Sequence, residues 1–286
     1  MSIRSAVAAA MRSCPFPGRF RVSDLMRRMF GDEELPFDLP IDIYRIRVNA
    51  PVFQPMYYTG AVDWNVTRYL WRHIQPGDTV FDLGANIGSV AIAISRKVGS
   101  GRVFAFEALE ANYRELCFNV RRNGISNIVP IFAAITNTTG TLRVPKLAQS
   151  GNYSLASDSV DATEIPTWSL DDFCARHGVE QIDLMKIDIE GSETKALRGA
   201  YRLLSSGAIR QILIEFNPYW LKKMGSSSTE LYGEFDSHRL KVFQLTRFAG
   251  VIPTNRSAVH GVCKRAGFTN LVVCSPDVAA TVFRKL

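Results

Sequence analysis

The sequence predicts an α/β fold whose central parallel sheet carries helices on both faces. Three observations support this prediction. From Thr79 onward, short apolar segments alternate with longer segments of helical pattern, as strands and helices do in such folds. Four of the apolar segments are nearly continuous runs, which is typical of parallel strands that are buried on both faces. Each of these four runs ends in an acidic residue.

The expected elements follow one another closely along the chain. Strands are predicted at 79–84, 102–107, 128–133, 182–188 and 209–216, with two more in the later runs LKVFQL and NLVVCS. Helices are predicted at 89–97, at about 111–122 and at about 192–204. Pro130 places the third strand near a sheet edge, because proline cannot donate to a strand ladder.

The chain is expected to divide into an N-terminal extension, residues 1–55, and a main domain, residues 56–286. Its first 30 residues carry six arginines and one acidic residue. We interpret this segment as a basic helix packed on the edge of the domain, with a membrane-surface or nucleic-acid-binding arm as the alternative. Four prolines between 36 and 55 then predict an irregular crossing. The extension either covers the site as a lid or docks a partner.

The composition favours a folded protein of a reducing compartment. Hydrophobic residues make up 47% of the chain and charged residues 21%, as in a chain with a sizeable core. The five cysteines include no C-x-x-C pair, so a disulfide framework or a zinc site is not expected. No run approaches the roughly 20 apolar residues that span a bilayer, and we expect a cytoplasmic protein. The net charge of +7 permits anionic partners without requiring them.

Acidic residues end the four apolar strands and predict where a ligand binds. In an open α/β sheet, ligands bind outside the carboxyl ends of the strands, so these four side chains should converge on one rim. The four residues are Asp82, Glu107, Asp188 and Glu215.

A glycine turn follows the first of these strands in the stretch VFDLGANIG. A dinucleotide turn needs a further glycine where this chain has Asn86, because that glycine lets the backbone approach a pyrophosphate. A cofactor without phosphates tolerates the asparagine. S-adenosylmethionine fits this description, and a nicotinamide-dependent oxidoreductase is disfavoured for the same reason.

The residues around the turn suit the groups of S-adenosylmethionine. Glu107, at the end of the next strand, can accept hydrogen bonds from both ribose hydroxyls. Asp82 can take the ammonium group, directly or through water. The amide groups that open the helix at Gly88 face the carboxylate of the cofactor. The predicted cofactor-binding set is Asp82, Gly84, Asn86, Gly88, Glu107 and Ala108.

Five sequence blocks resemble the FkbM family of S-adenosylmethionine-dependent methyltransferases in order and spacing. They are VFDLGANIG, RVFAFEA, SLDDF, IDLMKIDIEGSE and ILIEFNP, and they extend the resemblance from about Asp63 to Ser275. The resemblance implies a class I, Rossmann-like methyltransferase sheet of seven strands with the last one antiparallel. It also implies O-methylation of a hydroxyl on a sugar, glycan or polyketide-type molecule. The chain departs from the family pattern at Ser89 and Ala108, which bears on how the cofactor sits.

The block IDLMKIDIEGSE supplies the candidate catalytic residues. A hydroxyl is a poor nucleophile, so a base or a metal should help to remove its proton. Asp188 and Glu190 would present both carboxylates on one side if the backbone stayed extended there. Lys186 would share that side and pair with a carboxylate. The same two carboxylates could instead bind a divalent cation such as magnesium, and the sequence does not separate base from metal ligand.

The polar insertion before the fourth strand supplies candidate substrate contacts. Asn152 and Tyr153 could donate to an oxygen or stack on a ring, although an ordinary surface turn is equally compatible with SGNYS. The expected partner is a hydroxylated small molecule or glycan. The sequence predicts neither its identity nor the oligomeric state.

Two other functions stay open as alternatives. NPYW, at residues 217–220, resembles the signature of enzymes that methylate the amino groups of nucleic-acid bases. That signature should follow the fourth strand, whereas here it follows the fifth, so nucleic acid is not the expected partner. A methyltransferase fold used only as a binding module is the other alternative, and the intact set of cofactor acids and glycines disfavours it.

Overall fold

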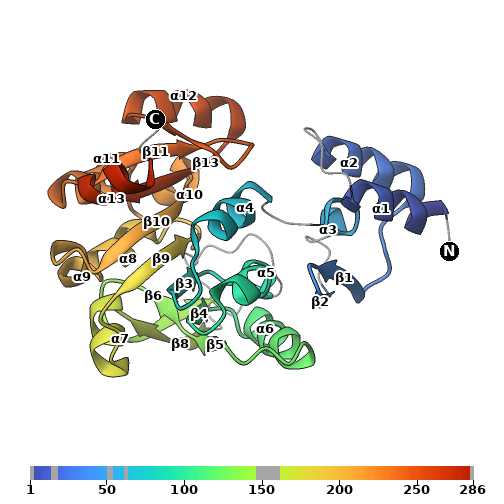
Figure 1. Cartoon of the computed structure of the whole chain (residues 1–286), viewed down its shortest axis with the longest axis horizontal. Coiled ribbons are helices and arrows are strands. Elements are labelled where there is room, and N and C mark those ends of the chain that lie inside the picture. Colours follow the sequence, from blue (N-terminus) through green and yellow to red (C-terminus); the bar gives the residue numbers. More distant parts are fainter. Residues whose placement is uncertain (1–2, 14–18, 50–53, 61–63, 146–161, 284–286) are drawn as a thin grey trace.

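An eight-stranded sheet runs through the middle of the molecule in this computed structural model (Figure 1). The structure describes residues 3–13, 19–49, 54–60, 64–145 and 162–283. The strands of the sheet lie in the order β12-β11-β13-β10-β9-β3-β4-β5. Their bounds are Thr79–Leu83 (β3), Arg102–Glu107 (β4), Ile128–Phe132 (β5), Ile182–Ile187 (β9), Ile209–Phe216 (β10), Lys241–Leu245 (β11), Val251–Pro253 (β12) and Thr269–Cys274 (β13).

The predicted mostly parallel sheet with an antiparallel last strand is confirmed. Strands β5, β4, β3, β9 and β10 pair in parallel, and β13 pairs antiparallel with both β10 and β11. The structure adds one strand to the seven expected, because the chain folds back after β11 and pairs Val251 with Leu245 in the short strand β12. Pro130 lies in the outermost strand β5, where the missing N–H interrupts no inner ladder.

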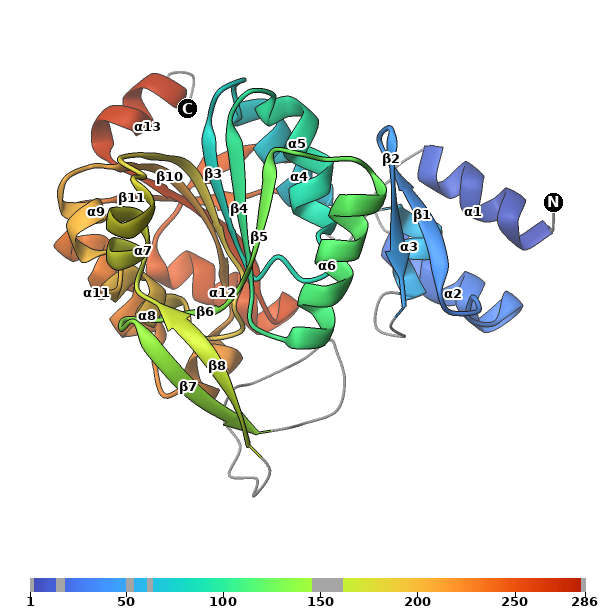
Figure 2. The same cartoon turned by 90° about the horizontal axis from the view of Figure 1, so that it is seen from below.

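Helices cover both faces of the sheet, as the alternation predicted (Figure 2). One face packs against α4 (Trp64–His73), α5 (Ser89–Val98), α6 (Glu110–Arg122) and α13 (Pro276–Val282). The other face packs against α7 (Leu170–His177), α8 (Glu193–Arg198), α9 (Tyr201–Ser205), α10 (Pro218–Lys223), α11 (Ser228–Ser237) and α12 (Arg256–Ala266). None of the helices in the described segments is long and apolar enough to cross a membrane.

The order of the strands positions the site. β3 and β9 are neighbours, and β4 lies on the far side of β3 while β10 lies on the far side of β9. The chain therefore runs from β3 toward one edge of the sheet and from β9 toward the other. Where the strand order reverses in this way, a crevice opens at the carboxyl ends of the strands. Asp82 lies in β3 and Glu107 ends β4, while Asp188 directly follows β9.

The described parts of the chain between β5 and β9, residues 133–145 and 162–181, contain regular structure where only a polar excursion was predicted. They include a small sheet of β6 (Ala134–Ile135), β7 (Gly140–Pro145) and β8 (Ala162–Trp168), with β8 in the middle. The helix predicted at 192–204 divides into α8 and α9. Gly199 lies at the division, and a Cβ there would come within 2.2 Å of the carbonyl oxygen of Thr136, directly after β6, so only glycine fits against this backbone.

The N-terminal extension contains two helices and a hairpin. Helices α1 (Ile3–Ser13) and α2 (Arg19–Phe30) pack on α3 (Gln54–Thr59). The irregular crossing expected from the prolines is wrong for residues 37–48, which form the antiparallel pair β1 (Phe37–Ile41) and β2 (Tyr44–Val48). Pro40 is accommodated because this hairpin is a separate two-stranded sheet with free edges. Its apolar residues belong to the same core cluster as α5 and α6.

Aromatic side chains fill the core below the middle of the main sheet. Phe173 of α7 is 1% exposed, and its ring centroid lies 4.8 Å from Phe106, 5.6 Å from Phe104 and 5.8 Å from Phe81. All three contacts are edge-on, the geometry that the charge distribution of aromatic rings favours. Phe173 therefore fixes α7 to β3 and β4.

We expect Phe173→Ala to lower the free energy of unfolding by about 3–5 kcal/mol, because the cavity has aromatic walls that cannot collapse freely. Urea unfolding followed by fluorescence measures this change. Phe248→Ala is the matched control, since that ring is 54% exposed and its loss should change stability by less than about 0.5 kcal/mol. Equal effects at both positions would contradict the assigned core.

Candidate active site

The glycine turn, residues 84–88, joins β3 to α5 and passes close to the end of β9. Gly84 has φ 80°, and a Cβ there would lie 1.9 Å from the Asp188 carbonyl oxygen, so only glycine fits. Asn86 also adopts a left-handed conformation, with φ 54°. Gly88 caps α5 without a side-chain hydrogen bond, which leaves the first N–H groups of the helix open to an anionic group.

Glu107 reaches from the end of β4 to the glycine turn. Its two carboxylate oxygens accept hydrogen bonds from the N–H of Asn86 and the N–H of Leu109, both at 2.8 Å. Burial raises the pKa of Glu107, and the donating N–H groups act in the opposite direction. The side chain of Asn112 also bonds to this carboxylate. A carboxylate has about four acceptor positions, so acceptor capacity remains for the ribose of a cofactor. Ala108, the next residue, packs against the small-sheet cluster.

Lys186 connects the two acids at the centre of the crevice. Its ammonium nitrogen lies 3.2 Å from Asp82 Oδ1, 3.4 Å from Asp188 Oδ2 and 3.4 Å from the Gly84 carbonyl oxygen. The register of β3 against β9 places Asp82 opposite Lys186, which explains the first contact. The side chains of Asp82 and Lys186 are 1% and 6% exposed, whereas that of Asp188 is 35% exposed. Asp188 is thus the member of this cluster that solvent or a substrate can reach.

The acidic turn, residues 188–191, directs the chain from β9 into α8. The N–H of Asp188 donates to the Leu83 carbonyl at 3.1 Å and continues the strand pairing by one residue. The backbone does not stay extended beyond it, because Glu190 has φ 50°. The geometric premise for placing Asp188 and Glu190 on one side is therefore not met. The roles of Asp188 and Glu190 must therefore be argued separately, from the position of each residue in the turn.

Helix α10 packs directly on the acidic turn. A Cβ at Gly191 would lie 2.2 Å from the carbonyl oxygen of Trp220, so the glycine allows this close approach. The Asn217 side-chain oxygen accepts from the Trp220 N–H at 3.4 Å and caps α10. Residues 217–220 thus adjoin the acidic turn although they follow a different strand.

Sequence reasoning missed Glu193, whose side chain binds the backbone of the acidic turn. Its side chain accepts hydrogen bonds from the N–H groups of Gly191, at 3.1 Å, and Ile189, at 3.4 Å. Glu193 is 2% exposed, and burial raises its pKa to about 7, with the charge of Asp188 acting in the same direction. The available signal was its position at the start of a helix directly after the glycine of IDIEG, where a carboxylate can reach back to the preceding backbone.

Two predictions for this site concern substrate and metal ligands. Asn152 and Tyr153 lie outside the described residues. Among the residues that the structure does describe, no group of three or more His, Cys, Asp or Glu side chains is arranged to hold a metal ion.

The raised pKa of Glu193 predicts a pH-dependent stability. Between about pH 4.5 and 7 the folded protein keeps a proton at Glu193 that the unfolded chain releases. This contribution to stability is present below about pH 4.5 and is lost as the pH rises through about 7. Glutamine at this position can accept the same hydrogen bonds without a charge. From about pH 5 to 8, the free energy of unfolding should therefore fall by about 2 kcal/mol more in the wild type than in Glu193→Gln.

Urea unfolding at several pH values measures this difference. The exposed Glu180→Gln is the control and should follow the wild type. Parallel pH profiles for the wild type and Glu193→Gln would contradict the assignment.

Comparison with known proteins identifies the family. The family model described as the methyltransferase FkbM domain matches residues 82–244, more than half of the chain. The chain is 25% identical over 155 residues to the hexuronic acid methyltransferase AglP of Haloferax volcanii, covering 54% of this chain and 62% of that protein. It is 27% identical over 187 residues to the 31-O-demethyl-FK506 methyltransferase FkbM of Streptomyces tacrolimicus, covering 53% of this chain and 70% of that protein.

One solved structure aligns with part of the chain at low identity. Fibrillarin of Aeropyrum pernix, crystallised with natively bound S-adenosyl-L-methionine, aligns with a TM-score of 0.40 and 16% identity over 71% of this chain and 68% of that one. The chain spans less than two thirds of the length of AglP. The match to the family model runs from Asp82 in β3 to Gln244 in β11 and includes the glycine turn, Glu107 and the acidic turn, and on this match the chain belongs to the FkbM family of methyltransferases.

Proposed function

We propose that this protein transfers a methyl group from S-adenosylmethionine to a hydroxyl oxygen of a sugar, glycan or polyketide-type acceptor. The observation that carries the proposal is the cluster of Asp82, Lys186 and Asp188 beside the glycine turn. The cluster combines a buried acid for the cofactor with a partly exposed acid that faces the same crevice. The two relatives named above act, by their names, on a hexuronic acid and on demethylated FK506.

The residues present fit the cofactor. Glu107 would hold the ribose hydroxyls, Asp82 the ammonium group, and the open N–H groups of α5 the carboxylate. Gly84 allows the glycine turn to lie directly against the acidic turn, since any Cβ there would collide with it. Bound S-adenosylmethionine supplies an electrophilic methyl group on a sulfonium, whose transfer needs a nucleophile aligned with the breaking bond.

Asp188 is the proposed general base. Its carboxylate is 35% exposed, so an acceptor hydroxyl can reach it, whereas the acid Asp82 is buried. The ammonium group of Lys186 fixes the carboxylate from the protein side at 3.4 Å. Asp188 takes the hydroxyl proton as the oxygen gains the methyl group. Glu190 is the second candidate, and the alternative role of both carboxylates as ligands of a divalent cation such as magnesium has no further support among the described residues.

Aromatic and cationic side chains beside the acidic turn favour a ring-shaped acceptor. Tyr219 is 65% exposed, its ring lies 5.1 Å from that of Trp220, and Lys223 lies 4.7 Å above the same indole. Aromatic faces stack on sugar rings and other flat apolar faces, and a lysine attracts a carboxylate. The backbone of Trp220 adjoins Gly191, so the helix that carries these side chains packs on the turn that holds the proposed base.

Methylation of nucleic-acid bases receives less support from the geometry. The side-chain oxygen of Asn217, which would hold the base amino group, accepts a backbone hydrogen bond as the cap of α10. The acidic turn lies where that signature belongs, after β9.

Isothermal titration with S-adenosylmethionine tests the cofactor assignment. We expect binding to the wild type, binding at least about tenfold weaker to Glu107→Ala because two hydroxyl acceptors are lost, and no binding of NADH. Glu110→Ala is the control, because its side chain is 58% exposed and lies on the next helix. An unchanged dissociation constant for Glu107→Ala would contradict the ribose assignment.

Methyl transfer to a panel of acceptors tests the chemistry. The panel holds hexuronic acids, neutral sugars, glycans and macrolide polyketides with free hydroxyls, together with single-stranded DNA and RNA. We expect a methyl ether on a hydroxylated acceptor and a 10²–10⁴-fold lower turnover for Asp188→Asn, with cofactor affinity unchanged.

Glu190→Gln separates the two candidate bases. A larger loss for Glu190→Gln than for Asp188→Asn would move the proton transfer to Glu190. A methylated base instead of a methyl ether would overturn the proposal. Cofactor binding without transfer to any acceptor would favour a binding module.

A further inference from the structure

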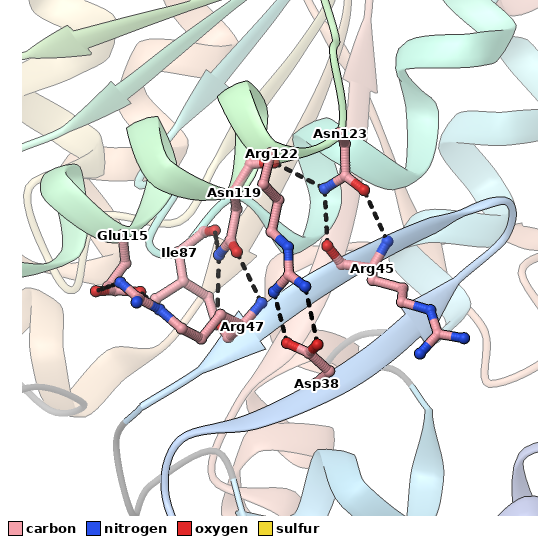
Figure 3. Close-up of polar contacts among 8 residues, drawn as sticks. All are labelled: Asp38, Arg45, Arg47, Ile87, Glu115, Asn119, Arg122 and Asn123. Carbon is pink, nitrogen blue, oxygen red and sulfur yellow. Dashed lines mark hydrogen bonds and ion pairs between the residues drawn. The ribbon is translucent and has the colours of Figure 1, made fainter.

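The free edge of strand β2 is closed by two asparagine side chains of α6 (Figure 3). The N–H of Arg47 donates to Asn119 Oδ1 at 2.7 Å, and Asn119 Nδ2 donates to the Arg47 carbonyl at 3.2 Å. One turn later, Asn123 makes the same two contacts with Arg45, at 2.9 and 2.7 Å. Each amide thus imitates a neighbouring strand, and α6 takes the place of the strand that the hairpin lacks.

Only one of the two asparagines reaches the cofactor-binding region as well. Asn119 Nδ2 also donates to the Ile87 carbonyl at 3.0 Å, and Asn119 is fully buried. Ile87 lies within the glycine turn, between Asn86 and Gly88, which both have left-handed backbones. Asn123 Nδ2 instead donates its second hydrogen bond to the Asn119 carbonyl within α6. One amide therefore holds the hairpin and the glycine turn at the same time.

The hairpin is fixed firmly enough to act as a support. Arg47 forms a two-point ion pair with Glu115 at 2.9 and 2.6 Å, and Arg122 forms one with Asp38 at 2.5 and 2.8 Å. Two-point arginine–carboxylate pairs fix orientation as well as distance. On the other side of the hairpin, apolar residues including the fully buried Ile46 pack into the main core.

We infer that the hairpin is a working part of the cofactor site, with Asn119 as the positioning residue that transmits its support to the glycine turn. The N–H groups of the turn are held from β4 by Phe106 and Glu107. Asn119 holds the carbonyl of Ile87 from the other side, next to the left-handed Asn86, and such a backbone conformation persists only where its surroundings fix it. The inference rests on the proposed function, since it concerns the binding of S-adenosylmethionine. Coupling between two sites is reciprocal, so bound cofactor must also stabilise the bonds between Asn119 and Arg47.

The matched pair Asn119→Ala and Asn123→Ala tests the inference. Each variant loses two bonds to β2, one to the N–H and one to the carbonyl of a single arginine, and a third bond to a backbone carbonyl. The third bond lies within α6 for Asn123, and only for Asn119 does it reach Ile87 in the glycine turn. Titration with S-adenosylmethionine, at a temperature where circular dichroism shows both variants folded, should give about tenfold weaker binding to Asn119→Ala. Asn123→Ala should bind within about twofold of the wild type. Equal affinities in the two variants would overturn the inference.

A measurement on the wild type needs no variant to fold. With selectively ¹⁵N-labelled arginine, the exchange of the Arg47 amide hydrogen is followed with and without S-adenosylmethionine. We expect cofactor to slow the exchange of Arg47 about fivefold or more and to leave Arg45, which donates to Asn123, within about twofold. Unchanged exchange at Arg47 in a protein that binds the cofactor would overturn the inference alone, whereas a wild type that binds no cofactor would overturn the proposed function with it.

Discussion

The buried ammonium group of Lys186 is the interaction on which the active-site geometry depends. It contacts Asp82 on β3, Asp188 after β9 and the carbonyl of Gly84, so it joins the two strands at the point where the sheet order reverses. A buried charge without partners costs several kcal/mol. Removing one member of a buried ion pair is therefore strongly destabilising, because the other charge stays buried and unpaired. The positions of the glycine turn and the acidic turn are therefore coupled. The close approach of the two turns follows, and with it the requirement for glycine at position 84.

The site is also held by residues outside the cluster of Asp82, Lys186 and Asp188. Helix α10 packs against Gly191 and fixes the acidic turn from one side. The side chain of Glu193 accepts hydrogen bonds from the N–H groups of Ile189 and Gly191 in the same turn. Helix α6 lies between the glycine turn and the hairpin, and Asn119 contacts both. The two turns that face the crevice thus have separate supports, one from the C-terminal half of the chain and one from the N-terminal extension.

Local sequence patterns predicted the sheet and its terminal acids but not the contacts between distant segments. The positions of Asp82 and Glu107 were predictable because a buried parallel strand is a continuous apolar run in the sequence. The end of that run marks the carboxyl edge of the sheet, where a ligand binds. The hairpin was missed because Pro40 argues against a strand, and only the free edge of a two-stranded sheet makes it tolerable. Glu193 looked like an ordinary first-turn acid, since its burial depends on packing against other elements. The bond from Asn119 to Ile87 joins residues 32 positions apart, and no periodicity records it.

The charge of the cluster gives a physical reason to prefer S-adenosylmethionine over a phosphate-bearing cofactor. One lysine lies between two carboxylates, so the ion-paired cluster of Asp82, Lys186 and Asp188 carries one net negative charge. S-adenosylmethionine carries a sulfonium and an ammonium against one carboxylate, which leaves one net positive charge. A pyrophosphate would bring further negative charge to this cluster and to Glu107. Because the side chains of Asp82 and Lys186 are buried, such a repulsion is only weakly screened. The substitution of asparagine for glycine at position 86 and the charge of the strand-end acids thus favour the same class of cofactor for independent reasons, one steric and one electrostatic.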